Sequence, residues 1–301
     1  MTNGDGNTVA AERLPLHLRL RHGAEWLALA GALALVRVVP LSVMTGFMGR
    51  AWRLFGPLNK RHRRALQNLA RAFPEKTDAE REAIARDMWD NLGRIAAETL
   101  SLDRLVADPA RFDIDVEAVR AHVGDRGAVV VSMHSGNWEI ATLGGLAAGW
   151  ETIGLYKQLN NPRSEALLRG LREPIYPGGL LPKGHEAARR LLSMVRRGGR
   201  AAMLADLRDR RGAVFPFFGH DAFATTYPAS IACAAGVPLV ACRVLRLPGN
   251  RFRITAEVVD VPLTGARKAD ALALTRRYHE IFEGWIRETP AQWMWIMRKW
   301  V

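Results

Sequence analysis

The sequence feature that most constrains the fold is a repeated order of short apolar run, turn and helix through the middle of the chain. Residues 128–133 form a β-branched apolar run, residues 134–137 carry turn-forming side chains, and residues 141–148 are typical of a helix. Two more short apolar runs follow at 151–156 and 200–204, each beyond a stretch of helical character. Strands that alternate with helices in this order build a parallel sheet covered by helices. The sequence therefore predicts an α/β fold.

The rest of the chain extends this sheet and adds a segment before it. Residues 237–245 and 250–259 predict two further strands, and the second alternates apolar and polar side chains, as a strand with one buried face does. We predict a mixed, largely parallel central sheet flanked by helices, with an apolar helical segment at the N-terminus. Residues 1–58 form this predicted segment, and residues 59–301 form the predicted main domain.

Residues that can carry chemistry stand at or beyond the ends of three predicted strands. His134 follows the run 128–133, Tyr156 closes the next strand, and Asp206 comes shortly after 200–204. The carboxyl ends of parallel strands lie at one edge of the sheet, where open α/β folds bind ligands. We therefore expect the loops after these strands to converge on one site.

His134 and Glu139 form an H-x-x-x-x-E pair. On one continuous helix their side chains would lie about 140° apart, so the pair requires a turn between them, which Ser135-Gly136-Asn137 can form. Histidine can take a proton from a hydroxyl, and a carboxylate on its other ring nitrogen fixes the tautomer. This predicts His134 as a general base oriented by Glu139, with the nucleophile supplied by the substrate. The alternative is a structural histidine at a strand end beside a helix-start glutamate.

The string MHSGNWE at residues 133–139 resembles the catalytic motif of the late acyltransferases of lipid A biosynthesis, the lauroyl/myristoyl acyltransferase family. Other segments resemble this family in the same order along the chain: Arg61-His62-Arg63-Arg64, Asn68-Leu69, Ala72-Phe73-Pro74, Asn91-Leu92-Gly93-Arg94 with Glu98, Tyr156, Asn161-Pro162, Asp206, Val214–Gly219 and Gln292-Trp293-Met294-Trp295. The resemblance runs from about residue 60 to the C-terminus.

This resemblance implies an acyltransferase of lipopolysaccharide biosynthesis, with residues 59–301 as the acyltransferase domain. It would move a fatty acyl chain from acyl carrier protein or coenzyme A to a hydroxyl of a lipid A precursor. The thioester is a co-substrate, and neither a cofactor nor a metal is expected. Asp206 and Arg172 match functional residues of the family, although Leu207 stands where the family usually has glutamine. The alternatives are a strand-end turn aspartate and a surface arginine.

Several side chains are candidates for binding substrate or stabilising the oxyanion. We expect the substrate-binding residues to be Asn137, Trp138, Tyr156, Phe217 and Arg208. The aromatic run that contains Phe217 could line an acyl slot or belong to the core. Oxyanion donors are expected among the backbone N–H groups around Gly136 and Asn137, or from Arg172.

The charge of the chain and its N-terminal segment indicate where the protein acts. A net charge of +13 favours anionic partners, here an acyl carrier protein and anionic membrane lipid. The most apolar window, residues 26–48, is interrupted by Arg37 and Pro40 and has basic flanks. Such a segment is typical of a helix or helical hairpin attached to a membrane surface. Together with the family resemblance, it predicts that the protein is located at the cytoplasmic face of the inner membrane. The alternative is a buried helix packed on the domain.

The sequence also bears on three other function classes. An enzyme of the same mechanism could acylate another glycolipid or a lysolipid. Charge alone would also fit a nucleic-acid-binding protein, but the arginines are dispersed and no zinc-finger or RNA-recognition signature is present. A serine hydrolase is disfavoured because the sequence lacks a G-x-S-x-G motif. We therefore expect no nucleic-acid partner.

Overall fold

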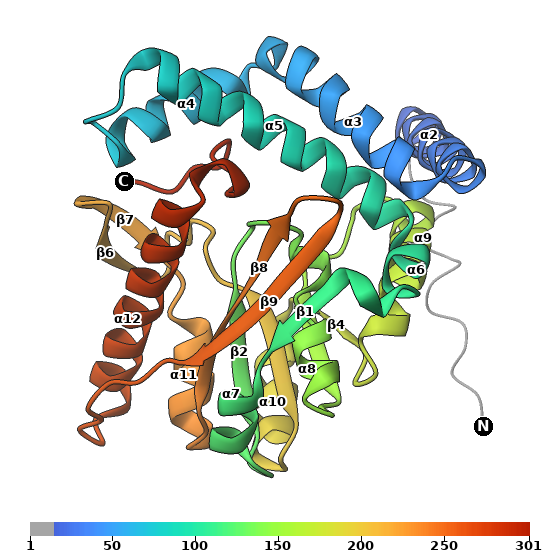
Figure 1. Cartoon of the computed structure of the whole chain (residues 1–301). Helices are drawn as coiled ribbons and strands as arrows, with labels where there is room; N and C mark the ends of the chain where they lie inside the picture. Colours follow the sequence, from blue (N-terminus) through green and yellow to red (C-terminus); the bar gives the residue numbers. More distant parts are fainter. Residues whose placement is uncertain (1–14) are drawn as a thin grey trace, which may run out of the picture.

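The computed structural model describes residues 15–301, and its centre is a seven-stranded sheet with helices on both faces (Figure 1). The strand order is β1-β9-β8-β2-β5-β3-β4. The five strands from β8 to β4 are parallel, whereas β9 pairs antiparallel with β8 and parallel with β1. The sheet is therefore mixed and largely parallel, which confirms the predicted fold class.

The elements have these bounds. The strands are β1 Phe112–Asp115, β2 Ala128–Ser132, β3 Thr152–Tyr156, β4 Leu180–Pro182, β5 Arg200–Leu204, β6 Ala213–Phe217, β7 His220–Ala224, β8 Leu239–Leu247 and β9 Arg251–Val258. The α-helices are α2 Leu16–Val38, α3 Leu41–Phe55, α4 Arg61–Ala72, α5 Asp78–Leu100, α6 Leu102–Val106, α7 Glu117–Val123, α8 Leu143–Ala147, α9 Pro162–Arg172, α10 His185–Arg196, α11 Tyr227–Ala235 and α12 Arg267–Glu288. Short 3₁₀ turns are η1 Gly56–Leu58, η2 Pro109–Arg111, η3 Trp138–Ile140, η4 Glu173–Ile175 and η5 Pro290–Gln292.

Most predicted strands match the structure closely, and the differences have local causes. The strand β4 was not predicted, because its three residues are too few to show a period. The aromatic run 214–219 belongs to a separate antiparallel hairpin, β6–β7, rather than to the central sheet. The helix predicted at 141–148 is shorter, because the 3₁₀ turn η3 ends at Ile140 and α8 begins only at Leu143.

The helices α3, α4 and α5 form a layer across the carboxyl edge of the sheet (Figure 1). Thr77 and Glu80 start α5 with the predicted capping box, in which each side chain accepts from the other residue's backbone N–H. The helix α3 lies close against α5 because Gly93 has no side chain: a Cβ there would come within 2.3 Å of the Met48 carbonyl oxygen. This layer brings polar side chains of α5 to the strand ends below.

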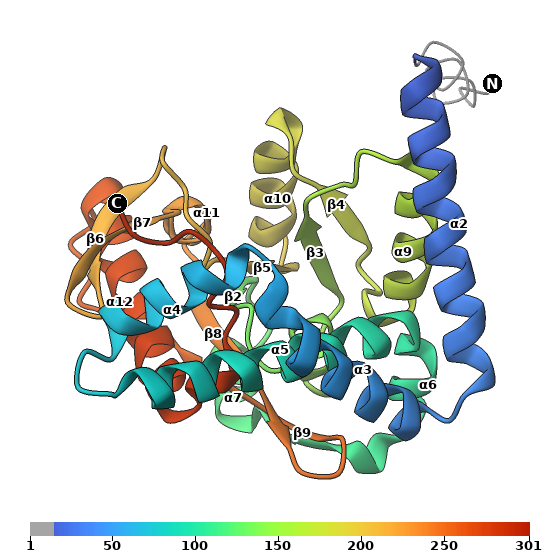
Figure 2. The same ribbon diagram turned by 90° about the horizontal axis from the view of Figure 1, so that it is seen from above.

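The N-terminal segment is helical, as predicted, and α2 lies along the side of the molecule beside α9 (Figure 2). The chain breaks between α2 and α3 at Pro40, since proline offers no backbone N–H and disfavours helix at the preceding residue. Within residues 15–301 no helix has both the length and the apolarity to cross a bilayer. Residues 1–14 of the predicted 1–58 segment lie outside the described residues.

Candidate active site

The strand register places His134 opposite Asp206. The neighbouring parallel strands β2 and β5 pair Ser132 with Leu204, and each functional residue comes two positions later in its own chain segment. Parallel strands rise equally per residue, so both side chains emerge at the same level beyond the carboxyl edge. As predicted, the ends of β2, β5 and β3 lie side by side in the sheet.

The carboxylate of Asp206 is the hydrogen-bond partner of His134. One oxygen lies 2.7 Å from Nδ1 of the ring, and the other accepts from the His134 backbone N–H at 2.9 Å and from Nε1 of Trp293 at 2.9 Å. Burial alone would raise the pKa of Asp206, but the charge of His134 and the hydrogen bonds from His134 and Trp293 hold it well below its usual range. An ionised carboxylate accepts the Nδ1 proton, which leaves the Nε2 lone pair of His134 free to act as a base.

The predicted pairing of Glu139 with His134 is wrong in this structure. Both oxygens of Glu139 accept from Arg172, at 2.7 Å from Nε and 2.7 Å from Nη2. Burial works to lower the pKa of Arg172, but the hydrogen bonds and charge of Glu139 raise it by more. Glu139 lies within the 3₁₀ turn η3, which directs it toward the end of α9, whereas Asp206 lies two residues beyond β5, the neighbour of the strand β2 that leads to His134. The motif glutamate therefore holds Arg172 and does not orient the histidine.

The turn after His134 is fixed by a buried polar network. Gly136 has a φ of +59°, and a Cβ there would come within 2.0 Å of the Val244 carbonyl oxygen, so the turn requires glycine. Asn137 donates to Glu98 at 2.8 Å and accepts from the Glu139 backbone N–H at 3.1 Å. Arg246 in turn holds both oxygens of Glu98, at 2.6 and 2.7 Å. The backbone N–H of Gly136 donates to the Gln292 carbonyl at 3.1 Å, so the predicted oxyanion role of that group is not supported.

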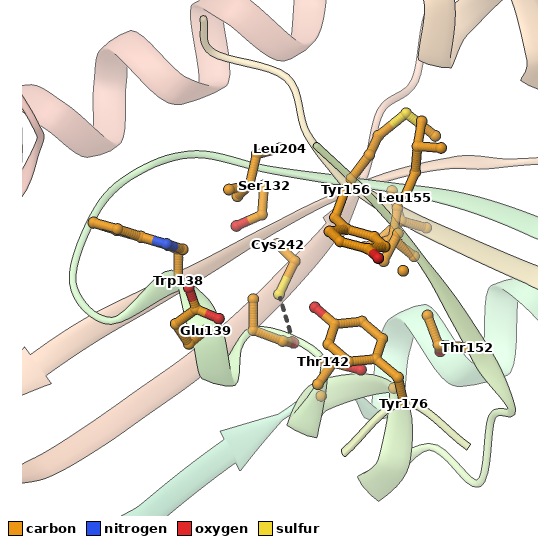
Figure 3. A pocket seen from close by; sticks show the side chains of 18 of the residues that line it. Ser132, Trp138, Glu139, Thr142, Thr152, Leu155, Tyr156, Tyr176, Leu204 and Cys242 are labelled. Carbon is orange, nitrogen blue, oxygen red and sulfur yellow. Dashed lines mark hydrogen bonds between the residues drawn. The ribbon is translucent and has the colours of Figure 1, made fainter. Parts of the chain in front are cut away.

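A cavity of about 250 Å³ opens beside His134 and runs along one face of the sheet. His134, Trp138, Glu139 and Arg172 line one part of it. Apolar side chains and small residues from β2, β3, β5, β8, β9, α7, α8 and the adjoining loops line the remainder: Val116, Val119, Val130, Gly144, Gly145, Trp150, Gly154, Leu155, Ala202, Met203, Leu204, Val240 and Ala256. Figure 3 shows the side chains of Leu155 and Leu204 in this lining. The cavity therefore combines a polar end at the histidine with an apolar slot.

The structure separates the predicted substrate-binding residues into two groups. Trp138 and Tyr156 line the cavity. The ring of Trp138 lies 5.1 Å from that of His134, and the Tyr156 hydroxyl donates to Glu165 at 2.6 Å. Asn137 is fully buried in the network described above and does not line this cavity. Asn137 instead fixes the turn that follows His134.

Phe217 and Arg208 also lie outside the lining of this cavity. Phe217 is buried in the main hydrophobic cluster, which is the core alternative left open by the sequence. The guanidinium of Arg208 lies 4.8 Å from the ring of Phe223 on β7. Neither residue is placed to contact a molecule in the slot.

Sequence reasoning missed further residues of the site. Trp293 belongs to a recognised C-terminal segment, but its bond to Asp206 spans 87 positions and has no local signal. Lys157 and Lys183 line the cavity and bring positive charge to it. Lys157 could have been found from the sequence, because it directly follows the predicted strand 151–156. Burial raises the pKa of the Cys242 thiol to about 12, which disfavours this cavity-lining cysteine as a nucleophile.

The fold and site define a class: an α/β protein with a carboxylate-held histidine beside an apolar slot, an arrangement suited to general-base chemistry on an apolar substrate. Comparison with known proteins agrees. A family model described as bacterial lipid A biosynthesis acyltransferase matches residues 11–301. The chain belongs to this family and is an acyltransferase.

Individual relatives have names consistent with the family. The chain is 26% identical over 291 residues to the lipid A biosynthesis myristoyltransferase of Escherichia coli K12, covering 92% of this chain and 87% of that protein. It is 28% identical over 296 residues to the lipid A biosynthesis palmitoleoyltransferase of the same organism, covering 94% and 92%. Lipid A biosynthesis acyltransferase 1 of Shigella flexneri is 27% identical over 298 residues, covering 92% and 87%.

Proposed function

We propose that this protein transfers a fatty acyl chain from an acyl thioester to a hydroxyl of a lipid A precursor, with His134 as the general base. The observation that carries the proposal is the position of His134, whose Nδ1 lies 2.7 Å from the buried Asp206 carboxylate while the ring lines an apolar cavity. The relatives named as myristoyl- and palmitoleoyltransferases of lipid A biosynthesis support the reaction class and the acceptor.

The chemistry follows from the proton positions. Nε2 of His134 takes the proton from the acceptor hydroxyl as its oxygen attacks the thioester carbonyl carbon. The tetrahedral intermediate collapses, the carbon–sulfur bond breaks, and the imidazolium returns the proton to the leaving thiolate. Asp206 stabilises the imidazolium between these two steps. Arg172 lines the site with two of its nitrogens held by Glu139, so its fixed positive charge favours the developing oxyanion.

The charge and shape of the cavity support a choice of donor and acceptor. The apolar part of the cavity suits the acyl chain, and Lys157, Lys183 and Arg172 line the cavity with positive charge. Anionic phosphates are present both on the pantetheine arm of an acyl carrier and on a lipid A precursor, and cationic side chains favour either. We propose acyl carrier protein as the donor and coenzyme A as the alternative carrier.

A transfer assay with purified protein tests this function. Labelled acyl-acyl carrier protein is offered with a lipid A precursor and, separately, with lysophospholipids; acyl-coenzyme A is tested in parallel. We expect label on the precursor. Label only on a lysophospholipid would keep the reaction and replace the acceptor, and no transfer from either donor to any acceptor would contradict the proposal.

The length of the apolar slot provides a test of the acyl site. Ala202 lies on β5 between Val130 and Gly154 of the neighbouring strands, and all three residues line the cavity. Phenylalanine at position 202 fills part of the slot. We expect Ala202→Phe to lower kcat/KM for a myristoyl donor about 10- to 100-fold relative to an octanoyl donor. The octanoyl donor is the internal control, and equal losses for both donors would show that the chain does not enter this slot.

We also propose that the protein acts on the cytoplasmic face of the inner membrane and binds anionic lipid through α2 and α3. Exposed apolar side chains on these helices include Leu20, Leu27, Phe47 and Leu54, beside exposed basic residues. Apolar side chains with basic neighbours favour the surface of an anionic bilayer. Flotation with anionic vesicles should recover the protein, and replacing Phe47 and Leu54 by Ser should reduce recovery. Equal recovery of the double variant would contradict this surface assignment.

A further inference from the structure

A second cluster of titratable side chains is buried near the candidate active site. Lys299, in the C-terminal segment, and His279, on α12, are 1% and 2% exposed. The Lys299 Nζ lies 2.9 Å from Nε2 of His279. Neither residue lines the cavity, and the reaction proposed above uses neither. Among residues 15–301, no carboxylate forms an ion pair with Lys299. A buried lysine without such a partner carries a desolvation cost, so its presence calls for a reason.

The hydrogen bonds decide which group carries the proton. Nδ1 of His279 lies 2.9 Å from the Thr275 carbonyl oxygen, which can only accept, so Nδ1 bears hydrogen. Nε2 is then the acceptor for the Lys299 ammonium, and the imidazole is neutral. Burial and then the charge of Lys299 lower the pKa of His279 well below its usual range. The pair thus holds one positive charge, located on Lys299.

Aromatic rings connect this charge to Asp206. The Lys299 Nζ lies 5.0 Å from the centre of the Phe217 ring, within cation–π distance. The same ring packs against His279 at 6.0 Å and against Trp293 at 5.9 Å, and Trp293 donates to Asp206. Burial lowers the pKa of Lys299 to about 8, and the negative charge of Asp206 opposes that change. Asp206 is therefore a carboxylate whose negative charge stabilises the charged form of Lys299.

Two other titratable groups, both on the neighbouring helix α12, have hydrogen-bond partners other than Lys299. On α12, Glu283 accepts from the Phe218 backbone N–H and from Arg287. The Tyr278 hydroxyl, also on α12, donates to the Thr225 carbonyl, and burial raises its pKa far above neutral pH.

The remaining charged groups near the pair lie in loops and on the hairpin. His220 and Asp221 of the β6–β7 hairpin are exposed to solvent. Asp209, beyond β5, acts electrostatically on Tyr278 and accepts from the Arg211 backbone N–H. The charge of Asp206 therefore acts on Lys299 through the Phe217 and Trp293 rings, in an interior where both charged residues are buried.

We propose that Lys299, held by His279, is a positioning residue that balances the charge of Asp206 and thereby sets the pH range in which the His134–Asp206 pair is ready to accept a proton. This inference rests on the proposed function. A buried carboxylate without a second cation is balanced by a proton on its histidine, which removes the base. Lys299 supplies that second cation, so the carboxylate is balanced without a proton on its histidine.

The test compares charge removal in the interior with charge removal at the surface. Lys299→Met and Lys299→Gln each remove the buried charge, and the amide of the second can still donate to His279. Arg298→Met is the matched control, because Arg298 is the exposed neighbour of Lys299 and solvent screens its charge. We expect both Lys299 variants to move the acid limb of kcat/KM to higher pH by about one unit, and the control to leave it in place.

The outcomes separate this inference from the proposed function. An unmoved acid limb in both Lys299 variants, or an equal shift in Arg298→Met, would overturn it. If no acyl transfer is found for the wild type, the midpoint of the His134 ring resonance in an NMR titration replaces the rate, with His134→Gln for assignment. The same upward shift is expected there, and an unchanged midpoint in the Lys299 variants refutes the inference.

Stability gives an independent check on the buried charge. The unfolded lysine has a pKa of about 10.4, and burial lowers the folded value to about 8. Between these values the unfolded chain binds more protons, so stability of the wild type rises with pH through this window. We expect that rise to be absent from Lys299→Met. A rise of equal size in the variant would show that Lys299 is not a buried, titrating charge.

Discussion

Asp206→Asn is expected to lower kcat/KM for acyl transfer about 10³- to 10⁴-fold while the protein stays folded. One oxygen of Asp206 accepts from two fixed donors, the His134 backbone N–H and Trp293 Nε1, so the oxygen of asparagine takes that place. Its amide nitrogen then faces Nδ1 of His134 and donates to it. The ring proton moves to Nε2, and the group that should accept the hydroxyl proton is lost.

The matched comparison is Glu139→Gln, which leaves His134 and Asp206 untouched and weakens the bond to Arg172. We expect this variant to lose about tenfold or less in kcat/KM, as for one weakened charge-assisted hydrogen bond. Both variants are measured with the same donor and acceptor after circular dichroism has confirmed their fold. A larger loss for Glu139→Gln than for Asp206→Asn would restore the motif glutamate as the residue that orients the histidine.

Glu98→Ala is expected to lower the free energy of unfolding by about 3–5 kcal/mol. Glu98 is fully buried and accepts two hydrogen bonds from Arg246 and one from Asn137. Removing it leaves the largely buried guanidinium of Arg246 without its counter-charge, and it frees the side chain that fixes the turn after His134. Activity should therefore fall together with stability, because the position of the catalytic turn depends on the same network.

Asp113→Ala provides the control for this prediction. It breaks an ion pair with Arg253 between β1 and β9 in which both side chains are about half exposed. Exposed pairs contribute about 0–1 kcal/mol, so chemical unfolding should detect little change. Similar losses in the two variants would show that the Glu98 network stabilises the protein no more than a surface pair does.

The sequence predicted the sheet well because its information is local. Apolar β-branched runs of about the right length, followed by turns and helices, identify parallel strands and their carboxyl ends. The same reasoning placed His134, Tyr156 and Asp206 at one edge, where the strand order β2-β5-β3 brings them together. The strand order itself, which makes β5 the neighbour of β2, is set by packing between segments far apart in the chain.

The prediction for Glu139 was wrong for the same reason: the contact depends on segments far apart in the chain. A spacing of five residues suggested a local pair with His134, whereas the actual partner lies 72 positions away. The sequence matched Asp206 to a functional residue but could not show what it contacts. The Lys299–His279 pair was not predicted because a lysine in a basic, tryptophan-rich tail resembles a solvent-exposed residue, and its burial depends on α12 and the β6–β7 hairpin.

The measurement that tests the central claim most directly is a single-turnover transfer with His134→Ala. Excess enzyme is mixed with labelled acyl-acyl carrier protein and the lipid A precursor, and label is followed on donor, acceptor and protein. In the wild type, label should pass from donor to precursor without residing on the protein. In His134→Ala, it should stay on the donor, with transfer slowed about 10²- to 10⁴-fold. Transfer by the variant at the wild-type rate, or label bound covalently to the wild-type protein, would contradict His134 as the base that activates the acceptor hydroxyl.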